Sequence, residues 1–291
     1  MDKWCKAWYT DKVSLNFSPK GAFLMKKKLF FPALTIWGGA AAAILRLVQN
    51  RTGFEAETGL AVPGNPAGIA LAGLIVVLAA AFFLLSRQLP KAEKETFPAS
   101  FSTKESTFLM LPVIGSFLMI LSGAADLFAG LGGDAIFAPN LHILLGVFAA
   151  ASAVCLLGSA SACRSGKWQT AEDFNGTLLL PVVVLLVARL VLIYRVCSID
   201  PTLAAYAMEM LALLFLTLGY FRLSAFAFGE GKTSSFAFYT ALAVLFSLAS
   251  LADYGTHITA ISSLLLCAGG AAALLGFLVL RLCAPEENNE A

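Results

Sequence analysis

Charged residues are scarce in this sequence. Asp, Glu, Lys and Arg make up 13% of the 291 residues, whereas 59% of the chain is hydrophobic. An ordinary soluble domain carries about 25% charged residues, so this chain has too few polar side chains to cover a soluble surface of its size. The composition therefore argues against a soluble domain or a disordered chain. The formal net charge of +2 likewise argues against a nucleic-acid partner, which needs a concentrated basic face.

The signatures of several enzyme and receptor classes are also missing. No Walker-type loop, HExxH helix or GxSxG elbow occurs. No apolar run contains a lysine, which excludes a retinal Schiff base. No two cysteines have CxxC spacing, so neither a disulfide framework nor a zinc motif is indicated. The six cysteines are Cys5, Cys155, Cys163, Cys197, Cys267 and Cys283. We therefore do not expect an enzyme, although an intramembrane enzyme remains an alternative.

Long apolar runs are what the sequence has in abundance. A helix needs about 20 mostly apolar residues to cross the hydrocarbon core of a bilayer. None of these runs alternates polar and apolar residues as a β-barrel strand would. The sequence predicts an all-α integral membrane protein with about eight transmembrane helices. The runs cover residues 29–47, 67–86, 107–128, 141–162, 177–196, 202–222, 235–253 and 258–281.

The distribution of Lys and Arg predicts how the bundle is oriented. Sixteen of the 20 basic residues fall on one side of the eight runs. The positive-inside rule then places both termini in the cytoplasm of a bacterial cell, with the protein in its cytoplasmic membrane. Residues 1–28 form a basic segment in which Met25 is an alternative start, and residues 284–291 form an acidic cytoplasmic tail.

Four short patterns recur in the same order in both halves of the chain. Each correspondence is weak alone, because proline and arginine favour helix ends anyway. Together they predict a duplication of residues 29–164 as residues 165–283, giving a 4+4 parallel repeat about an axis normal to the membrane. The matches are Pro32 to Arg46 with Pro181 to Arg195, Asn65-Pro66 with Asp200-Pro201, Ala125-Asp126 with Ala252-Asp253, and His142-Ile143 with His257-Ile258.

Ionisable residues within the runs lie mostly in their outer halves, which predicts an outward-facing polar pocket. Arg189 and Glu209 lie about ten residues before and after the tight turn near Ser198, so both should sit roughly 15 Å deep on neighbouring helices. Because an unpaired charge there is costly, we expect the two either to form an ion pair or to line a cavity. The pair could simply fix the hairpin. It could instead bind an anionic solute or a proton, since arginine matches carboxylate and phosphate.

Two further groups are candidates. Arg195 and Arg46 could add to the ligand site, or could, like Asp253, lie at headgroup depth. Asp126, His142, Asp253 and His257 would gather at one depth if the repeat is real. Two imidazoles and two carboxylates can ligate a divalent metal, and two histidines can ligate a haem. Simple polar packing is the competing interpretation, and we expect no cofactor.

These observations favour a protein that binds or transports a small solute, either neutral or anionic, through the outward-facing polar pocket. Two alternatives remain. One is a sensor, regulator or membrane subunit that binds a cytoplasmic or membrane protein partner through the basic loops, because the inner halves of the runs hold few polar groups. The other is an enzyme or a metal or haem protein at the outer leaflet.

Overall fold

The computed structural model describes residues 19–55, 58–89, 95–103, 105–132, 137–165, 176–198, 203–254 and 260–283. Within these ranges the chain is helical, with two isolated β-bridges, Phe54 with Ala61 and Glu95 with Gly231. Eight helices are long and apolar enough to cross a membrane, which confirms the predicted set. They are α2 (Pro19–Thr52), α3 (Pro66–Arg87), α5 (Met110–Gly132), α6 (Pro139–Ser165), α7 (Leu180–Cys197), α8 (Ala207–Ala227), α9 (Thr233–Ser250) and α10 (Ile261–Cys283).

Short elements complete the chain. The five-residue helix α4 (Phe97–Phe101) lies between α3 and α5. Single 3₁₀ turns precede or follow the long helices, namely η1 (Ser106–Leu109), η2 (Gly176–Leu179), η3 (Leu203–Tyr206) and η4 (Leu251–Asp253).

The first long helix begins earlier than the apolar run predicted. The run starts at residue 29, but α2 begins at Pro19 and carries Pro32 in its interior. Hydropathy identifies the segment that can enter a membrane and does not identify where a helix starts. Lysine is a good helix former, so the basic residues before the run extend the helix.

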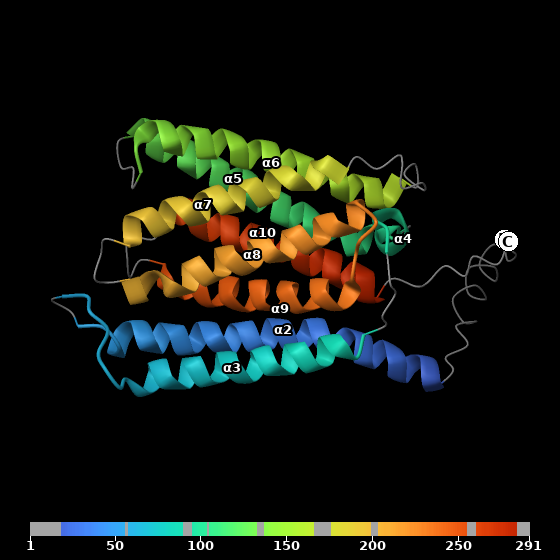
Figure 1. The fold of residues 1–291 in the computed structure, drawn as a ribbon, viewed down its shortest axis with the longest axis horizontal. Coiled ribbons are helices and arrows are strands. Elements are labelled where there is room, and N and C mark those ends of the chain that lie inside the picture. The colour runs from blue at the N-terminus through green and yellow to red at the C-terminus, as the bar shows by residue number, and fades with distance from the viewer. Residues whose placement is uncertain are drawn as a thin grey trace, which may run out of the picture.

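The long helices run side by side and alternate in direction (Figure 1). The end at which α2 begins and α10 ends carries Arg87, Arg164, Arg222 and Arg281, and we call it the basic end. The other end, at which α5 and α7 end and α10 begins, holds the polar cluster described below, and we call it the site end.

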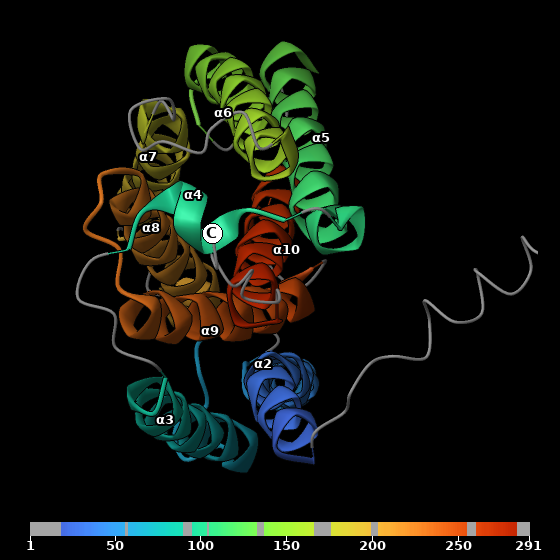
Figure 2. The ribbon, with the colours of Figure 1, turned by 90° about the vertical axis from the view of Figure 1, so that its right-hand side faces the viewer.

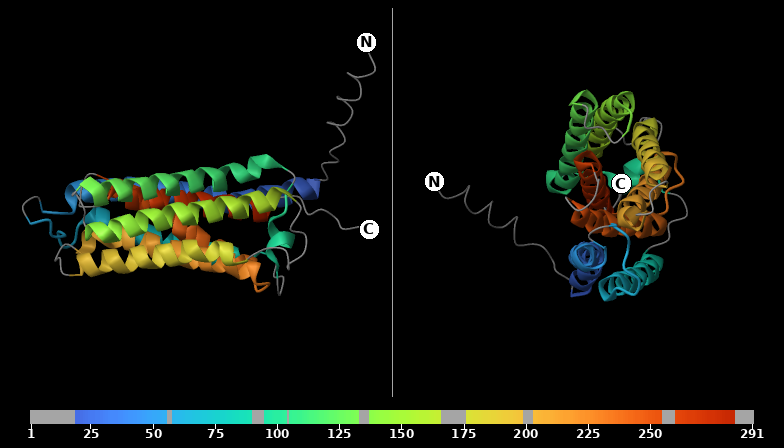
Figure 3. Two further views of the ribbon diagram at one scale, coloured as in Figure 1. Left: turned by 90° about the horizontal axis from the view of Figure 1, so that it is seen from above. Right: turned by 90° about the vertical axis from the view of Figure 1, so that its left-hand side faces the viewer.

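Viewed end-on, the helices form pairs around a buried centre (Figures 2 and 3). The α2–α3 pair lies against α9, the α7–α8 pair packs against α9 through α8, and the α5–α6 pair packs against α10 through α5. The centre is made by α9 and α10, which are the most buried of the eight, whereas α3 is the least buried. Many large apolar side chains are exposed on the outer faces, such as Val76 of α3 and Phe128 of α5. This pattern is consistent with a helical membrane bundle.

Glycines allow α5 to approach α6 and α10 closely. A Cβ added to Gly269 of α10 would lie 2.7 Å from the carbonyl oxygen of Gly115 in α5. Gly123 of α5 and Gly146 of α6 meet in the same way, each Cβ reaching 2.7 Å from the partner's carbonyl oxygen. Such contacts between backbones are the usual packing mode of membrane helices.

At the basic end, α4 lies across the mouth of the bundle (Figure 2). Phe97 and Phe101 are almost fully buried, and the Phe101 ring packs edge-on against Phe226, Phe236 and Phe277 at 5.2 to 6.0 Å. This group of five phenylalanines, which we call the phenylalanine plug, fills the space between α4 and the ends of α8, α9 and α10.

A buried polar triad holds the start of this segment. Glu95 accepts hydrogen bonds from Arg281 Nη2 at 2.7 Å and from Thr233 Oγ1 at 2.6 Å, and Arg281 Nε donates to Thr233 Oγ1 at 3.0 Å. The backbone of Glu95 is also paired with that of Gly231. The connection between α3 and α5 is therefore fixed to α9 and α10.

Candidate functional site

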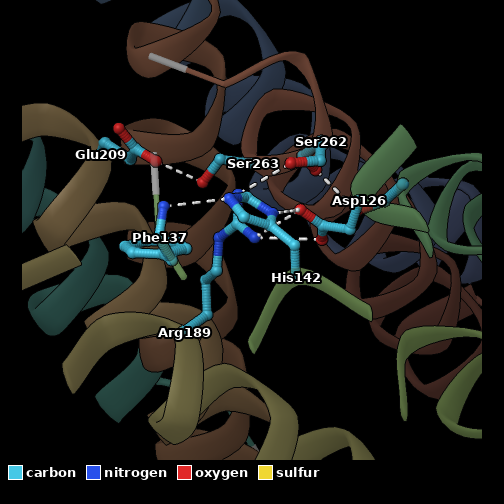
Figure 4. A network of polar contacts seen from close by, with 8 residues as sticks. Asp126, Phe137, His142, Arg189, Glu209, Ser262 and Ser263 are labelled. Carbon is cyan, nitrogen blue, oxygen red and sulfur yellow. Dashed lines mark hydrogen bonds and ion pairs between the residues drawn. The ribbon is translucent and has the colours of Figure 1, made fainter. Parts of the chain in front are cut away.

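The site is built around Arg189 of α7, whose side chain is 2% exposed (Figure 4). The helix around it is otherwise apolar, so the guanidinium must find its partners on neighbouring helices. Nη1 donates to both carboxylate oxygens of Asp126 in α5, at 2.9 and 3.0 Å, and Nη2 donates to Ser262 Oγ of α10 at 2.8 Å. Asp126 thus neutralises the arginine.

His142 of α6 supports the same carboxylate. Its Nε2 accepts the backbone N–H of Phe137 at 3.2 Å, so the ring proton lies on Nδ1 and is donated to Asp126 at 3.0 Å. This pattern describes a neutral imidazole. The Phe137 ring lies 5.0 Å from the His142 ring and 5.5 Å from Arg189 Cζ, and so covers both side chains. His142 is therefore a buried support for Asp126.

The expected ion pair between Arg189 and Glu209 is not what the described residues form. Glu209 of α8 accepts a hydrogen bond from Ser263 Oγ, whereas Arg189 is bound by Ser262, the preceding residue of α10. Figure 4 shows Ser263 next to the glutamate and Ser262 on the other side of the arginine, near Asp126. Arg189 finds its partners on α5 and α10, and Glu209 receives its hydrogen bond from α10, so the two side chains of the predicted pair are bound separately.

One polar atom of this cluster makes no hydrogen bond to any described residue. It is the buried Nε of Arg189. Leaving a buried donor unpaired costs roughly 1 to 3 kcal/mol, and more when the group is charged. The bonds made by the protein therefore leave the guanidinium incompletely satisfied.

A second cluster lies nearer the site end. Arg46 Nε of α2 contacts Asp253 Oδ1 at 2.6 Å, and both side chains are 1% exposed. Arg46 Nη2 also donates to the Ala205 carbonyl at 2.6 Å, and Asn50 Nδ2 donates to Asp253 at 2.8 Å. The Phe54 ring lies 5.6 Å from Arg46 Cζ. Arg46 and Asp253 are thus a pair within the protein, and they do not extend separately to its surface.

The remaining candidates are dispersed. Arg195 lies in the last turn of α7 and is exposed, away from the Arg189 cluster. Of the four proposed metal ligands, Asp126 and His142 meet, Asp253 belongs to the Arg46 cluster, and His257 lies outside the described residues. No group of three His, Cys, Asp or Glu side chains that could hold a metal occurs in the part of the chain that is described.

Three members of the site were not identified from sequence. Ser262 and Ser263 are small polar residues at the start of an apolar run, where they are common for other reasons. Phe137 is one of 23 phenylalanines. The one sequence feature that could have indicated them is the adjacent pair Ser262-Ser263. In the structure, Ser262 binds Arg189 of α7 and Ser263 binds Glu209 of α8.

The arrangement suits binding better than nucleophilic catalysis. In a Ser-His-Asp triad the histidine Nε2 takes the proton of the serine, but here His142 Nε2 accepts the Phe137 N–H, and Ser262 Oγ accepts a bond from Arg189. No family model, curated protein or solved structure matches the chain. The functional argument therefore rests on the side chains themselves.

Proposed function

We propose that the protein is a multi-pass protein of a bacterial cytoplasmic membrane that binds a small anionic solute at the Arg189 cluster. Its termini lie in the cytoplasm, so the site end faces outward. The sixteen basic residues on the opposite side support this orientation. A carboxylate or a phosphate is the class of solute that fits, because the planar guanidinium pairs with both.

The unpaired Nε of Arg189 is the observation that carries this proposal. Asp126 accepts from Nη1 and Ser262 accepts from Nη2, whereas the Nε–H lies on the edge of the same planar group. An acceptor oxygen of a solute at this edge would complete the set of hydrogen bonds. A purely structural ion pair would be expected to satisfy this buried N–H within the protein.

A thermal-shift screen tests the proposal. The purified protein is heated with acetate, lactate, benzoate or inorganic phosphate, with chloride as the ionic-strength control. A ligand at 100 times its Kd stabilises the folded state by about 2.7 kcal/mol, which raises the Tm by roughly 5 to 10 °C for a chain of this size.

Two arginine variants show whether the anion that raises the Tm binds at Arg189. Arg189→Gln should abolish the shift given by any anion that stabilises the wild type. Arg195→Gln removes an exposed arginine from the same helix and should leave the shift unchanged. Equal shifts in all three proteins, or no shift with any anion in the folded wild type, would contradict the proposal.

A non-transporting role is the second candidate, and the phenylalanine plug favours it. The basic end is filled by apolar rings and crossed by α4. A sensor or a membrane subunit needs the outer site but no route to the cytoplasm, and its basic loops would bind a soluble partner. Uptake of the stabilising anion into liposomes decides between the two roles. Binding without uptake supports the sensor or subunit.

The proposed 4+4 repeat is supported by two reciprocal ion pairs. Arg46 of α2 binds Asp253, which follows α9, and Arg189 of α7 binds Asp126 of α5. Each pair joins the first helix of one half to the third helix of the other. One detail differs from the matches between the two halves of the sequence, which paired Arg46 with Arg195 and not with Arg189. The helix packing does not follow the same symmetry, because α2 packs closely against α9 whereas α5 and α7, the equivalent pair, do not pack closely.

A further inference from the structure

The buried charges at the site end do not cancel. The described residues contribute two arginines, Arg46 and Arg189, and three carboxylates, Asp126, Asp253 and Glu209, each no more than 3% exposed. His142 adds no charge, because its Nε2 accepts a hydrogen bond. Each aspartate is paired with an arginine. Glu209 is therefore the carboxylate in excess.

Among the described residues, the hydrogen bond that Glu209 receives comes from a neutral donor. Ser263 Oγ donates a hydrogen bond to it from α10. The other groups that act on it are Arg189 of α7, which attracts its charge, Asp253 of η4, which repels it, and the thiol Cys267 of α10. Arg46 binds the Ala205 carbonyl, one turn before Glu209. Both arginines that reach this region are already engaged by aspartates.

An anion that enters beside Arg189 would make this imbalance worse. Two uncompensated negative charges in a region of low dielectric are expensive, since charges attract or repel much more strongly there than in water. Binding of a proton to the Glu209 carboxylate would remove one of these negative charges. A proton needs no cavity of its own. Buried acidic residues in membrane proteins are typical sites of proton uptake.

We infer that Glu209 is a proton-binding site, and that it takes up one proton when an anionic solute binds at Arg189. The proton forms an O–H bond on Glu209, and the solute brings the negative charge that Glu209 gives up. The net charge of the cluster is then the same before and after binding. Coupling to a solute rests on the function proposed above, whereas the proton site itself does not.

Infrared spectroscopy of the full-length protein in lipid nanodiscs tests the proton site directly. As the pH is lowered, a carboxylic-acid C=O band of a buried group should appear in the wild type and be absent from Glu209→Gln. Glutamine can still accept the Ser263 hydrogen bond, so this variant should fold. Glu105→Gln, which alters an exposed glutamate at the basic end, should keep the band.

Two spectroscopic results would overturn the proton site. One is a band that persists in Glu209→Gln. The other is the absence of any Glu209-dependent band over the pH range in which the protein stays folded.

The coupling is measured with whichever of acetate, lactate, benzoate or phosphate stabilises the wild type. Uptake of one proton with one anion strengthens apparent binding up to tenfold for each unit of falling pH, and Glu209→Gln should remove this dependence. If the anion binds the wild type with no pH dependence, the coupling is wrong and the proposed function stands. If no anion binds but the band belongs to Glu209, the proposed function is wrong and the proton site stands.

Discussion

Arg189 of α7 binds Asp126 of α5 through two hydrogen bonds of 2.9 and 3.0 Å, and both side chains are almost fully buried. The two helices belong to different halves of the chain, and α6 and α10 each add one polar side chain to this pair. The pair therefore fastens four helices to one another at a single point.

Removing only the Asp126 charge should destabilise the protein. Asp126→Asn leaves Arg189 with an uncompensated buried charge, and breaking a buried pair in this way costs about 3 to 5 kcal/mol. The measurement is thermal unfolding in detergent followed by tryptophan fluorescence. Glu105→Gln removes an exposed carboxylate and should leave the Tm within a degree or two. An unchanged Tm for Asp126→Asn would show that Arg189 is neutralised by another group.

The glycine contact between α5 and α10 should tolerate no large side chain. Gly269→Leu would force α10 away from the Gly115 backbone, and overpacking of this kind costs about 1 to 3 kcal/mol. Gly73→Leu is the matched control, because nothing lies within 4 Å of a Cβ added there. Unfolding temperatures of the two variants should differ clearly. Similar values would mean that the close approach of α5 and α10 is not maintained in solution.

The triad at the basic end should keep α4 in place. Arg281→Gln removes the charged partner of Glu95, so amide hydrogens of residues 95–103 should exchange faster than in the wild type. Arg164→Gln alters an exposed arginine at the same end and serves as the control. If exchange in this segment is equally slow in all three proteins, the phenylalanine plug alone holds α4.

Cysteine labelling tests the proposed orientation in whole cells. All six native cysteines are first replaced, and a single cysteine is introduced at Thr58 or at Lys232, which are exposed at the site end and the basic end respectively. A membrane-impermeant maleimide should label the Thr58 variant in intact cells and the Lys232 variant only after permeabilisation. The reverse pattern would place the site end in the cytoplasm.

The eight long helices were predictable because a membrane-spanning helix needs a long apolar run, and hydropathy identifies such runs directly. Helix starts were less predictable, as Pro19 and Pro32 of α2 show, because a helix can continue beyond the apolar segment.

The site was predictable only in part. The sequence identified Arg189 and Glu209 as buried ionisable groups, since such groups are rare in apolar runs. It assigned them to each other because they lie on consecutive helices. The actual partners, Asp126 and Ser263, come from α5 and α10, and spacing within one hairpin carries no information about helices packed from elsewhere in the chain.

The most direct test of the central claim replaces both members of the pair by apolar residues. Arg189→Met combined with Asp126→Leu leaves no unpaired charge at this position, and such replacements are often neutral or stabilising. We expect the double variant to keep a Tm close to that of the wild type and to lose the stabilisation by the carboxylate or phosphate that binds the wild type. A folded double variant that the same anion still stabilises to the same extent would contradict a solute site at Arg189.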